Sequence, residues 1–229
     1  MDFILIPGLW LDGAVWTETA TALQQAGHRV DALTLPGQGD GSTHATYDDQ
    51  VAALLAAVDR SESKPYVVGH SAASALAWVA ADARPDRLAG VAFIGGFPVP
   101  DGQTYAAFFP CRDGTMAFPG WEPFAGPDTA DLHEDVRRQI ADRMASVPEA
   151  VVRGLVRLRD KHRFEVPATL VCPEFTPDDA RAAIAGGDQP ELAAARLSLV
   201  DLESGHWPMF SCPDRLASVL ADAAIGSTR

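Results

Sequence analysis

The segment around Ser71 has the residue types and spacing of a serine nucleophile. It reads Tyr66-Val-Val-Gly-His-Ser-Ala-Ala73, a Val-rich run that leads directly into an Ala-rich, helix-like stretch. A serine at such a sharp turn needs small neighbours, and Gly69 and Ala73 stand two residues before and after it. The turn would expose the hydroxyl above a sheet and direct the amide of Ala72 into the same space. The pattern G-x-S-x-[GA] alone has little specificity, but its single match in the chain falls at the strand-to-helix junction that the chemistry requires.

A histidine that can act as general base follows the last apolar run. His206 lies in Ser204-Gly-His-Trp-Pro-Met209, between the run Leu197–Leu202 and the final helix-like stretch. An imidazole on such a loop can take the proton of a serine hydroxyl and later pass it to the leaving group. We expect the other five histidines to be surface or packing residues: His28, His44, His70, His133 and His162.

Short apolar runs alternate with amphipathic stretches, and this predicts the elements that position the two residues. The runs are Phe3–Pro7, Arg29–Leu35, Tyr66–Val68, Leu88–Ile94, Ala168–Cys172 and Leu197–Leu202. The helix-like stretches are Ala14–Ala26, Tyr47–Arg60, Ala72–Arg84, Asp178–Ala185 and Pro213–Ala224. Continuous apolar runs of this length are typical of buried parallel strands. The alternation predicts an α/β fold with a doubly wound, mostly parallel sheet and helices on both faces.

The alternation is interrupted between Phe97 and Arg163. Strand patterns are absent there, and two helix-like pieces, Asp131–Ala145 and Pro148–Asp160, follow a stretch rich in proline and aromatic residues. A long excursion between regular α/β units is typical of a cap over the sheet. We therefore predict a single domain with its core in residues 1–97 and 164–229 and a helical cap inserted over residues 98–163.

Four segments together resemble the α/β-hydrolase family, in particular its small esterases and methyl esterases. They are, in chain order, Ile6–Trp16, Leu35–Gly39, Gly69–Ala73 and Gly205–Pro208, and the resemblance covers nearly the whole chain. It implies an α/β-hydrolase fold, Ser71 as nucleophile and His206 as base. It also implies that the backbone amides of Leu9 and Ala72 form the oxyanion hole and that neither metal nor cofactor takes part. The chain departs from the family pattern at Pro7, where a histidine is usual, and at Ala73, where a glycine is usual.

The acid partner of His206 is ambiguous. The family's acid usually stands a few residues past the strand Ala168–Cys172, and Thr176 occupies the position where an aspartate is expected. Glu174 lies on the same loop, and its longer side chain could reach the imidazole and orient it. The other candidates are Asp178, Asp179 and Asp101. The first two are more readily explained as first-turn acids favoured by a helix dipole. If none serves, the chain has a catalytic dyad or has lost the activity.

The predicted cap concentrates aromatic residues between Tyr105 and Phe124, which form an apolar pocket wall, a small core of their own, or both. The predicted substrate-binding residues are Trp10, Phe97, Phe108, Phe109, Trp121 and Trp207.

The segment from Arg153 to Arg163 is strongly basic in an otherwise acidic protein. It is either a solvated helix face or an anion site for the substrate or a carrier.

Composition excludes several classes of function. With 31 acidic and 18 basic residues in 229, the formal charge of -13 opposes binding to nucleic acid or to an anionic membrane surface. The three cysteines are widely separated, which predicts neither a disulfide framework nor a zinc site. Without a leader or a long apolar run, we expect a cytoplasmic protein. Its partner would be a small-molecule acyl substrate, either free or bound to a carrier, and the oligomeric state stays open.

The sequence therefore predicts a serine hydrolase that cleaves a small carboxylic ester or thioester through an acyl-enzyme. Two alternatives stay open because the fold hosts other chemistries. One is a non-hydrolytic reaction at the same site, either cyanohydrin or C–C bond cleavage or the cyclisation of an acyl or polyketide intermediate. The other is a receptor that binds a ligand without turnover.

Overall fold

A parallel six-stranded sheet forms the centre of the computed structural model, which describes residues 1–227. The spatial order is β2 (Arg29–Ala32), β1 (Asp2–Ile6), β3 (Tyr66–His70), β4 (Gly90–Ile94), β7 (Ala168–Cys172) and β8 (Leu197–Asp201). Every neighbouring pair of these strands is parallel. The predicted α/β fold is confirmed, although the second strand ends three residues earlier than expected and β3 runs two residues further.

The burial of the strands follows their place in the sheet. Every residue of the four inner strands is buried, which is the reason for their unbroken apolar sequences. Alternate side chains serve opposite faces: Ile4 and Ile6 pack with the helices on one face, and Phe3 and Leu5 with those on the other. The edge strands β2 and β8 are only partly buried.

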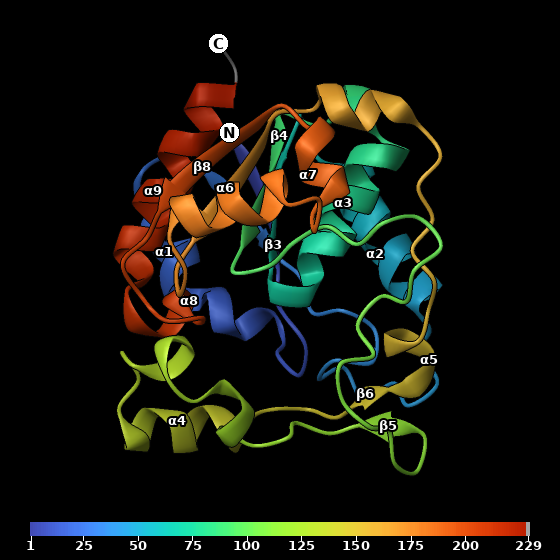
Figure 1. Cartoon of the computed structure of the whole chain (residues 1–229), viewed down its shortest axis with the longest axis vertical. Helices are drawn as coiled ribbons and strands as arrows, with labels where there is room; N and C mark the ends of the chain where they lie inside the picture. Colours follow the sequence, from blue (N-terminus) through green and yellow to red (C-terminus); the bar gives the residue numbers. More distant parts are fainter. Residues whose placement is uncertain (228–229) are drawn as a thin grey trace.

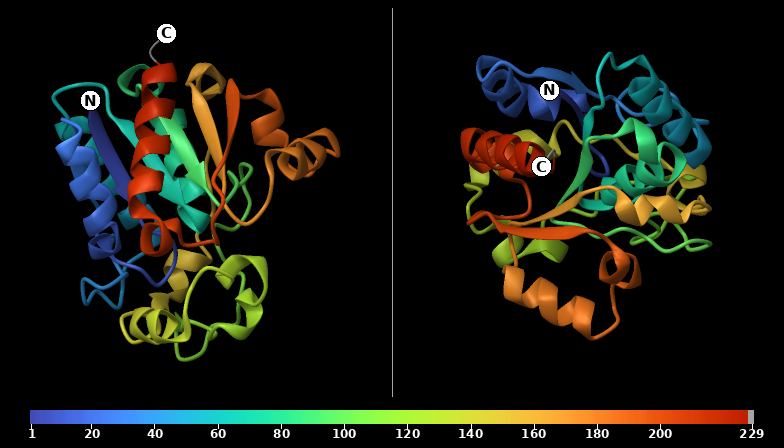
Figure 2. Two further views of the ribbon diagram at one scale, coloured as in Figure 1. Left: turned by 90° about the vertical axis from the view of Figure 1, so that its left-hand side faces the viewer. Right: turned by 90° about the horizontal axis from the view of Figure 1, so that it is seen from above.

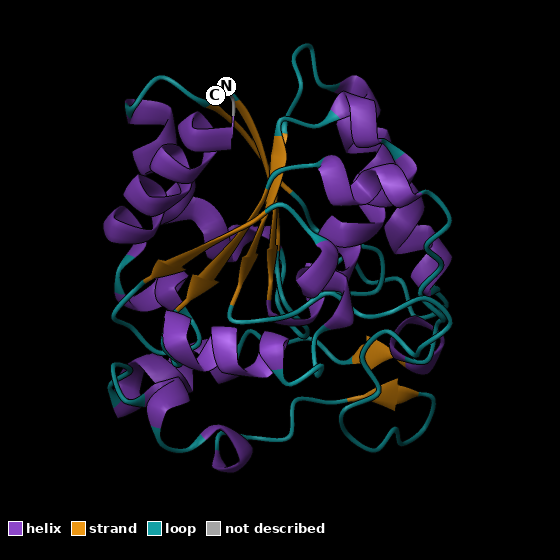
Figure 3. Ribbon diagram, turned by 45° about the horizontal axis from the view of Figure 1, so that its top comes forward, coloured by secondary structure: helices purple, strands orange, loops and turns teal. Residues whose placement is uncertain are grey.

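Helices cover both faces of the sheet (Figures 2 and 3). On one face α1 (Thr17–Gln25) packs against α9 (Pro213–Ser227), and on the other α2 (Tyr47–Arg60) packs against α3 (Ser74–Ala83). The short helices α6 (Pro177–Ala185) and α7 (Pro190–Ala194) lie beside β8, and α8 (Pro208–Ser211) precedes α9. The 3-10 turns are η1 (Gly13–Trp16), η2 (Ser71–Ala73), η3 (Pro85–Arg87), η4 (Glu122–Phe124), η5 (Pro127–Thr129) and η6 (Lys161–Glu165). Within residues 1–227 no helix is both long and apolar enough to cross a membrane.

The inserted segment (residues 98–163) lies beyond the carboxyl ends of the strands (Figure 1). It contains α4 (Glu134–Ala141), α5 (Glu149–Val152) and an antiparallel pair formed by β5 (Thr115–Met116) and β6 (Val147–Pro148). Its limits as a cap stay a prediction.

The helix expected over Pro148–Asp160 is wrong, because only α5 forms. The chain after α5 pairs its backbone with residues 102–106: the amide of Tyr105 donates to the carbonyl of Gly154, and the amide of Val156 donates to Gln103. Gly154 also lies against Tyr47, since an added Cβ would stand 2.2 Å from the Cβ of that residue. These tertiary contacts override the helical periodicity.

The buried basic residue of this stretch, Arg163, has structural partners. Arg163 is buried and forms ion pairs with Asp82 at 3.3 Å and with Glu191 at 3.0 Å. Asp82 also accepts the amides of Arg159 and Asp160, both at 2.8 Å. Because α5 ends at Val152, no α-helix ends at the basic residues from Arg157 to Arg163, and the anion site stays a prediction without that support. Asp82 fastens the end of the inserted segment to α3.

We predict that Asp82→Ala lowers the free energy of unfolding by about 3–5 kcal/mol, because it leaves the buried Arg163 without this partner and two amides without acceptors. Urea unfolding measures the loss. Asp86→Ala, at an exposed position nearby, is the control and should stay within about 0.5 kcal/mol of wild type. Equal effects of the two changes would contradict this view of Asp82.

Candidate active site

Ser71 has a strained backbone at the end of β3. Its φ of +54° lies in the left-handed region, which is the conformation that the motif predicts at this turn. The turn is also crowded: a Cβ added to Gly69 would lie 2.3 Å from the carbonyl oxygen of Ala73, and one added to Gly96 would lie 2.2 Å from that of Ser71. Glycine at both positions therefore lets β3, the Ser71 turn and the end of β4 approach one another closely.

His206 and Glu174 meet above this turn from two different loops. Nδ1 of His206, on the loop between β8 and α8, lies 2.7 Å from Oε1 of Glu174, on the loop between β7 and α6. Because a carboxylate only accepts, Nδ1 carries the proton and Nε2 of the neutral imidazole is left without one. Gly95, with a φ of +56°, makes room, since an added Cβ would lie 3.0 Å from both His206 Nδ1 and Glu174 Oε2.

The other acidic candidates lie away from His206. Asp178 pairs with Arg181, Asp179 bonds to Thr176 in a capping box, and Asp101 accepts the amide of Leu158 at 2.8 Å. Thr176 is the N-cap of α6, a position that threonine fills well. Of the four carboxylates weighed from the sequence, Glu174 is the one that contacts His206.

The loop after β1 (residues 7–12, the oxyanion loop) lies directly against the Ser71 turn. A Cβ added to Gly8 would stand 2.7 Å from Nδ1 of His70 and 3.2 Å from Cβ of Ser71. The fully buried amide of Gln38 donates to the carbonyls of Gly8 and Leu11, both at 3.0 Å, and so holds this loop in place. The backbone of Leu9 is thereby brought beside the turn that holds Ala72, and the oxyanion-hole roles of these two residues stay predictions.

His70 has a larger part than the sequence predicts. It is 1% exposed, and its Nε2 donates to the carbonyl oxygen of His206 at 2.8 Å. Burial, and secondarily the nearby His206, lower the pKa of His70 to about 3, although its hydrogen bond to His206 acts in the opposite direction. His70 is therefore neutral at working pH and links the Ser71 turn to the backbone of the proposed base.

A cavity of about 580 Å³ opens at Ser71 and Ala72. Residues 95–100, residues 187–190 and four further residues of the inserted segment line it. Phe97 and Phe108, two of the predicted substrate-binding residues, are among them, and Phe108 is 62% exposed. Within residues 1–227, Asp188 is the one charged side chain of this lining.

The other four predicted substrate-binding residues pack in a cluster of aromatic rings and are absent from this lining. They are Trp10, Phe109, Trp121 and Trp207. Phe124 lies at the centre, with ring-centroid distances of 6.2 Å to Trp10, 6.0 Å to Phe109 and 5.3 Å to Trp207. The cluster joins the inserted segment to the oxyanion loop and to Trp207, next to His206, so these aromatic residues form the small core that was the second interpretation of their sequence.

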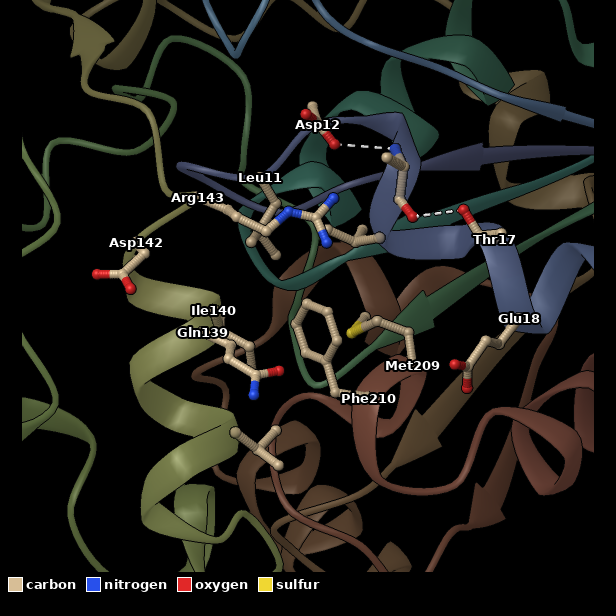
Figure 4. A pocket seen from close by; sticks show the side chains of 13 residues that line it. Leu11, Asp12, Thr17, Glu18, Gln139, Ile140, Asp142, Arg143, Met209 and Phe210 are labelled. Atoms are coloured by element: carbon tan, nitrogen blue, oxygen red, sulfur yellow. Dashed lines mark hydrogen bonds between the residues drawn. The ribbon is translucent and has the colours of Figure 1, made fainter.

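A larger cavity, of about 710 Å³, lies between η1, α1, α4 and α8 (Figure 4). Its apolar floor includes Leu11, Ile140 and Phe210, and its rim carries Asp12 and Arg143. Ser71, His206 and Glu174 do not line it. We therefore place the candidate site at the smaller cavity, which Ser71 and Ala72 line, although His206 and Glu174 belong to the lining of neither cavity.

Sequence reasoning missed several residues that shape this site. Gly95 and Gly96 could have been found, because a glycine pair directly after a buried strand indicates a close approach at its carboxyl end. The carbonyl of Asp128 and the carboxylate of Asp131, which bond the loop of His206, had no sequence signal, since their contacts depend on how the inserted segment folds back.

The model of the alpha/beta hydrolase family matches residues 3–219, which include Ser71, Glu174 and His206. The chain belongs to this family. The match confirms the resemblance that the four sequence segments indicate, and the structure arranges those segments around one edge of the sheet.

Similar proteins include several named esterases and hydrolases. A pyrethroid hydrolase from Sphingobium wenxiniae is 26% identical over 260 residues, which cover 97% of this chain and 87% of the relative. The fold is shared with an extracellular α/β-hydrolase from a Paenibacillus species, with a TM-score of 0.79 at 19% identity over 97% of this chain and 98% of that one. It is also shared with a methylesterase from Arabidopsis, with a TM-score of 0.75 at 17% identity over 99% of both chains.

We predict that Gln38→Ala lowers kcat/KM for an ester about tenfold and the free energy of unfolding by about 1–3 kcal/mol. The change leaves two buried carbonyls of the oxyanion loop without their donor and releases the backbone of Leu9. Gln25→Ala, at an exposed position in α1, is the matched control. Wild-type kinetics in Gln38→Ala would show that the loop does not need this support.

Proposed function

We propose that this α/β-hydrolase is a carboxylic ester hydrolase that works through an acyl-enzyme on Ser71. The observation that carries the proposal is the 2.7 Å hydrogen bond between His206 and Glu174, formed over the carboxyl end of the sheet where Ser71 occupies its strained turn. The family of the chain and the named activities of its relatives support ester cleavage.

In the first half-reaction, Nε2 of His206 takes the hydroxyl proton of Ser71 as the oxygen attacks the ester carbonyl. The amides of Leu9 and Ala72 hold the oxyanion that develops. His206 then gives its proton to the departing alkoxide, and the acyl group stays on Ser71. Glu174 keeps Nδ1 protonated and stabilises the imidazolium throughout this exchange.

In the second half-reaction, His206 takes a proton from water, which attacks the acyl-enzyme carbonyl. The tetrahedral intermediate collapses, the carboxylic acid leaves, and the proton returns to Ser71. No group beyond these residues and water is needed for the balance of atoms.

The cavity favours an uncharged ester. Its lining combines the rings of Phe97 and Phe108 with the neutral polar side chains of Gln103 and Thr104, and Asp188 is its one charge within the described residues. An anionic substrate would meet a like charge and no cation there, in a protein with a net charge of -13. A small neutral ester therefore fits better than a carrier-bound or carboxylated one.

We also propose that the reaction takes place in the cytoplasm. Cys111, Cys172 and Cys212 are all unpaired, which fits a reducing compartment.

We predict that Ser71→Ala and His206→Ala each lower kcat for p-nitrophenyl butyrate by about 10⁶-fold, because the nucleophile and base act as a unit. Glu174→Gln should lower kcat by about 10⁴-fold, because the amide favours the wrong imidazole tautomer. Asp178→Asn and Asp101→Asn are the controls and should keep wild-type rates, since neither residue contacts His206. Wild-type turnover in Ser71→Ala, or a loss confined to Asp101→Asn, would overturn the assignment.

We further predict that Asp188→Asn raises kcat/KM for the p-nitrophenyl monoester of succinic acid about two- to fivefold, with little change for p-nitrophenyl butyrate. The substitution removes the charge that repels a carboxylate at the cavity. Asp178→Asn makes the same change in net charge outside the cavity and should have no such effect. The gain should shrink at high salt, and an equal gain in both variants would contradict a local effect.

A further inference from the structure

Two residues of the inserted segment bind the backbone of the histidine loop (residues 202–207). The carboxylate of Asp131 accepts the amide of Gly205 at 2.7 Å. The carbonyl oxygen of Asp128 accepts the amide of His206 at 2.8 Å. Neither bond touches the imidazole, but together they fix two successive peptide units, Ser204–Gly205 and Gly205–His206, that lead to the Cα carrying the side chain of His206.

The histidine loop is shaped for this contact at Gly205. A Cβ added there would lie 2.4 Å from the carbonyl oxygen of Asp128 and 2.4 Å from Oδ1 of Asp131. The φ of Gly205 lies outside the left-handed region, so the backbone conformation itself does not demand glycine. The close approach of the inserted segment is the reason for a glycine at this position.

The carbonyl of His206 is held from the opposite side. It accepts the Nε2 proton of the buried His70 at 2.8 Å. Both backbone polar groups of His206 are therefore bound, the amide to the inserted segment and the carbonyl to the strand that leads into Ser71. Its side chain is bound in turn to Glu174 at 2.7 Å.

The next residue is enclosed by the same part of the inserted segment. Trp207 is 3% exposed, and its ring meets those of Trp121 and Phe124 edge-on, with centroid distances of 5.1 Å and 5.3 Å. Further along the segment, α4 is separated from η1 by the cavity of about 710 Å³ (Figure 4). Residues 121–132 thus supply both polar and aromatic contacts to the histidine loop.

We infer that Asp131 is a positioning residue for His206, and that the docking of residues 121–132 sets the general base in its working place. This inference rests on the proposed function and extends it, because it makes the inserted segment part of the catalytic support as well as of the cavity wall. Loss of the Asp131 contact frees the peptide between Ser204 and Gly205, one residue before His206. A shift of about 1 Å in a catalytic group can cost about 100-fold in rate.

The test compares Asp131→Ala, Asp131→Asn and the control Asp135→Ala, which removes an exposed carboxylate of α4 that pairs with Arg138. For p-nitrophenyl butyrate we expect Asp131→Ala to lower kcat about 10- to 100-fold with KM within about twofold of wild type. Asp131→Asn should recover most of kcat, because its carboxamide oxygen can still accept the amide of Gly205. Asp135→Ala should match wild type.

Wild-type kcat in Asp131→Ala would overturn the inference, and so would a loss that Asp131→Asn does not recover. If Asp131→Ala does not fold, Gly205→Ala decides instead, since its methyl group forces the same two segments apart while every hydrogen-bonding group remains. We expect a comparable fall in kcat there, and an unchanged kcat would refute the inference.

A second readout separates this inference from the proposed function. The Nδ1 proton of His206, bonded to Glu174, should give a low-field proton resonance that is absent in His206→Ala. We expect that resonance to weaken or vanish in Asp131→Ala and to persist in Asp135→Ala. Inactive wild-type protein would refute the proposed function alone, whereas an unaltered resonance in Asp131→Ala would refute the positioning role.

Discussion

The hydrogen bond between His206 and Glu174 is the contact on which the rest of the site depends. Its side chains are 11% and 14% exposed, so the carboxylate has lost most of its water and needs a partner to offset that cost. The same bond fixes the imidazole tautomer and leaves Nε2 free to accept a proton, as the proposed role of a base requires. Gly95 leaves space for this hydrogen bond because it has no side chain, and its positive φ is one that other residues rarely adopt. The geometry of the bond also depends on the two loops that carry His206 and Glu174 keeping their positions. Several contacts around the site hold these loops in position.

The parallel sheet brings these loops together at one of its edges. β3 ends just before Ser71, β4 just before Gly95, β7 two residues before Glu174, and β8 five residues before His206. Because all four strands run in the same direction, their carboxyl ends meet at one edge, where ligands of open α/β sheets bind. The connections then carry the finer positioning: Gln38 holds the oxyanion loop, His70 holds the carbonyl of His206, and Asp128 and Asp131 hold the backbone just before it.

The sequence predicts a feature well when neighbouring residues determine it, and poorly when it depends on contacts between distant segments. The buried strands and the Ser71 turn were predictable, because a continuous apolar run and a crowded turn depend on neighbouring residues. The acidic partner of His206 stayed open between Glu174, Asp178, Asp179 and Asp101, because Thr176 stands where an aspartate is expected. Only the folded loops show that the longer Glu174 reaches the imidazole from two residues earlier while Thr176 caps α6. The expected helix after Pro148 is shortened by pairing with residues 102–106, a contact between distant segments that periodicity cannot show. For the same reason, the sequence could not decide whether Trp10 and Trp207 line the cavity or pack in a core.

The most direct test of the central claim is peptide mapping after reaction with a fluorophosphonate, which phosphorylates a serine only where a base activates it and an oxyanion site accepts the new charge. Our account predicts one adduct per chain, on Ser71, with its rate of formation reduced by orders of magnitude when His206 is replaced by alanine and also strongly reduced when Glu174 is replaced by glutamine. An adduct on another residue, or an adduct on Ser71 that forms at the same rate without His206, would contradict it.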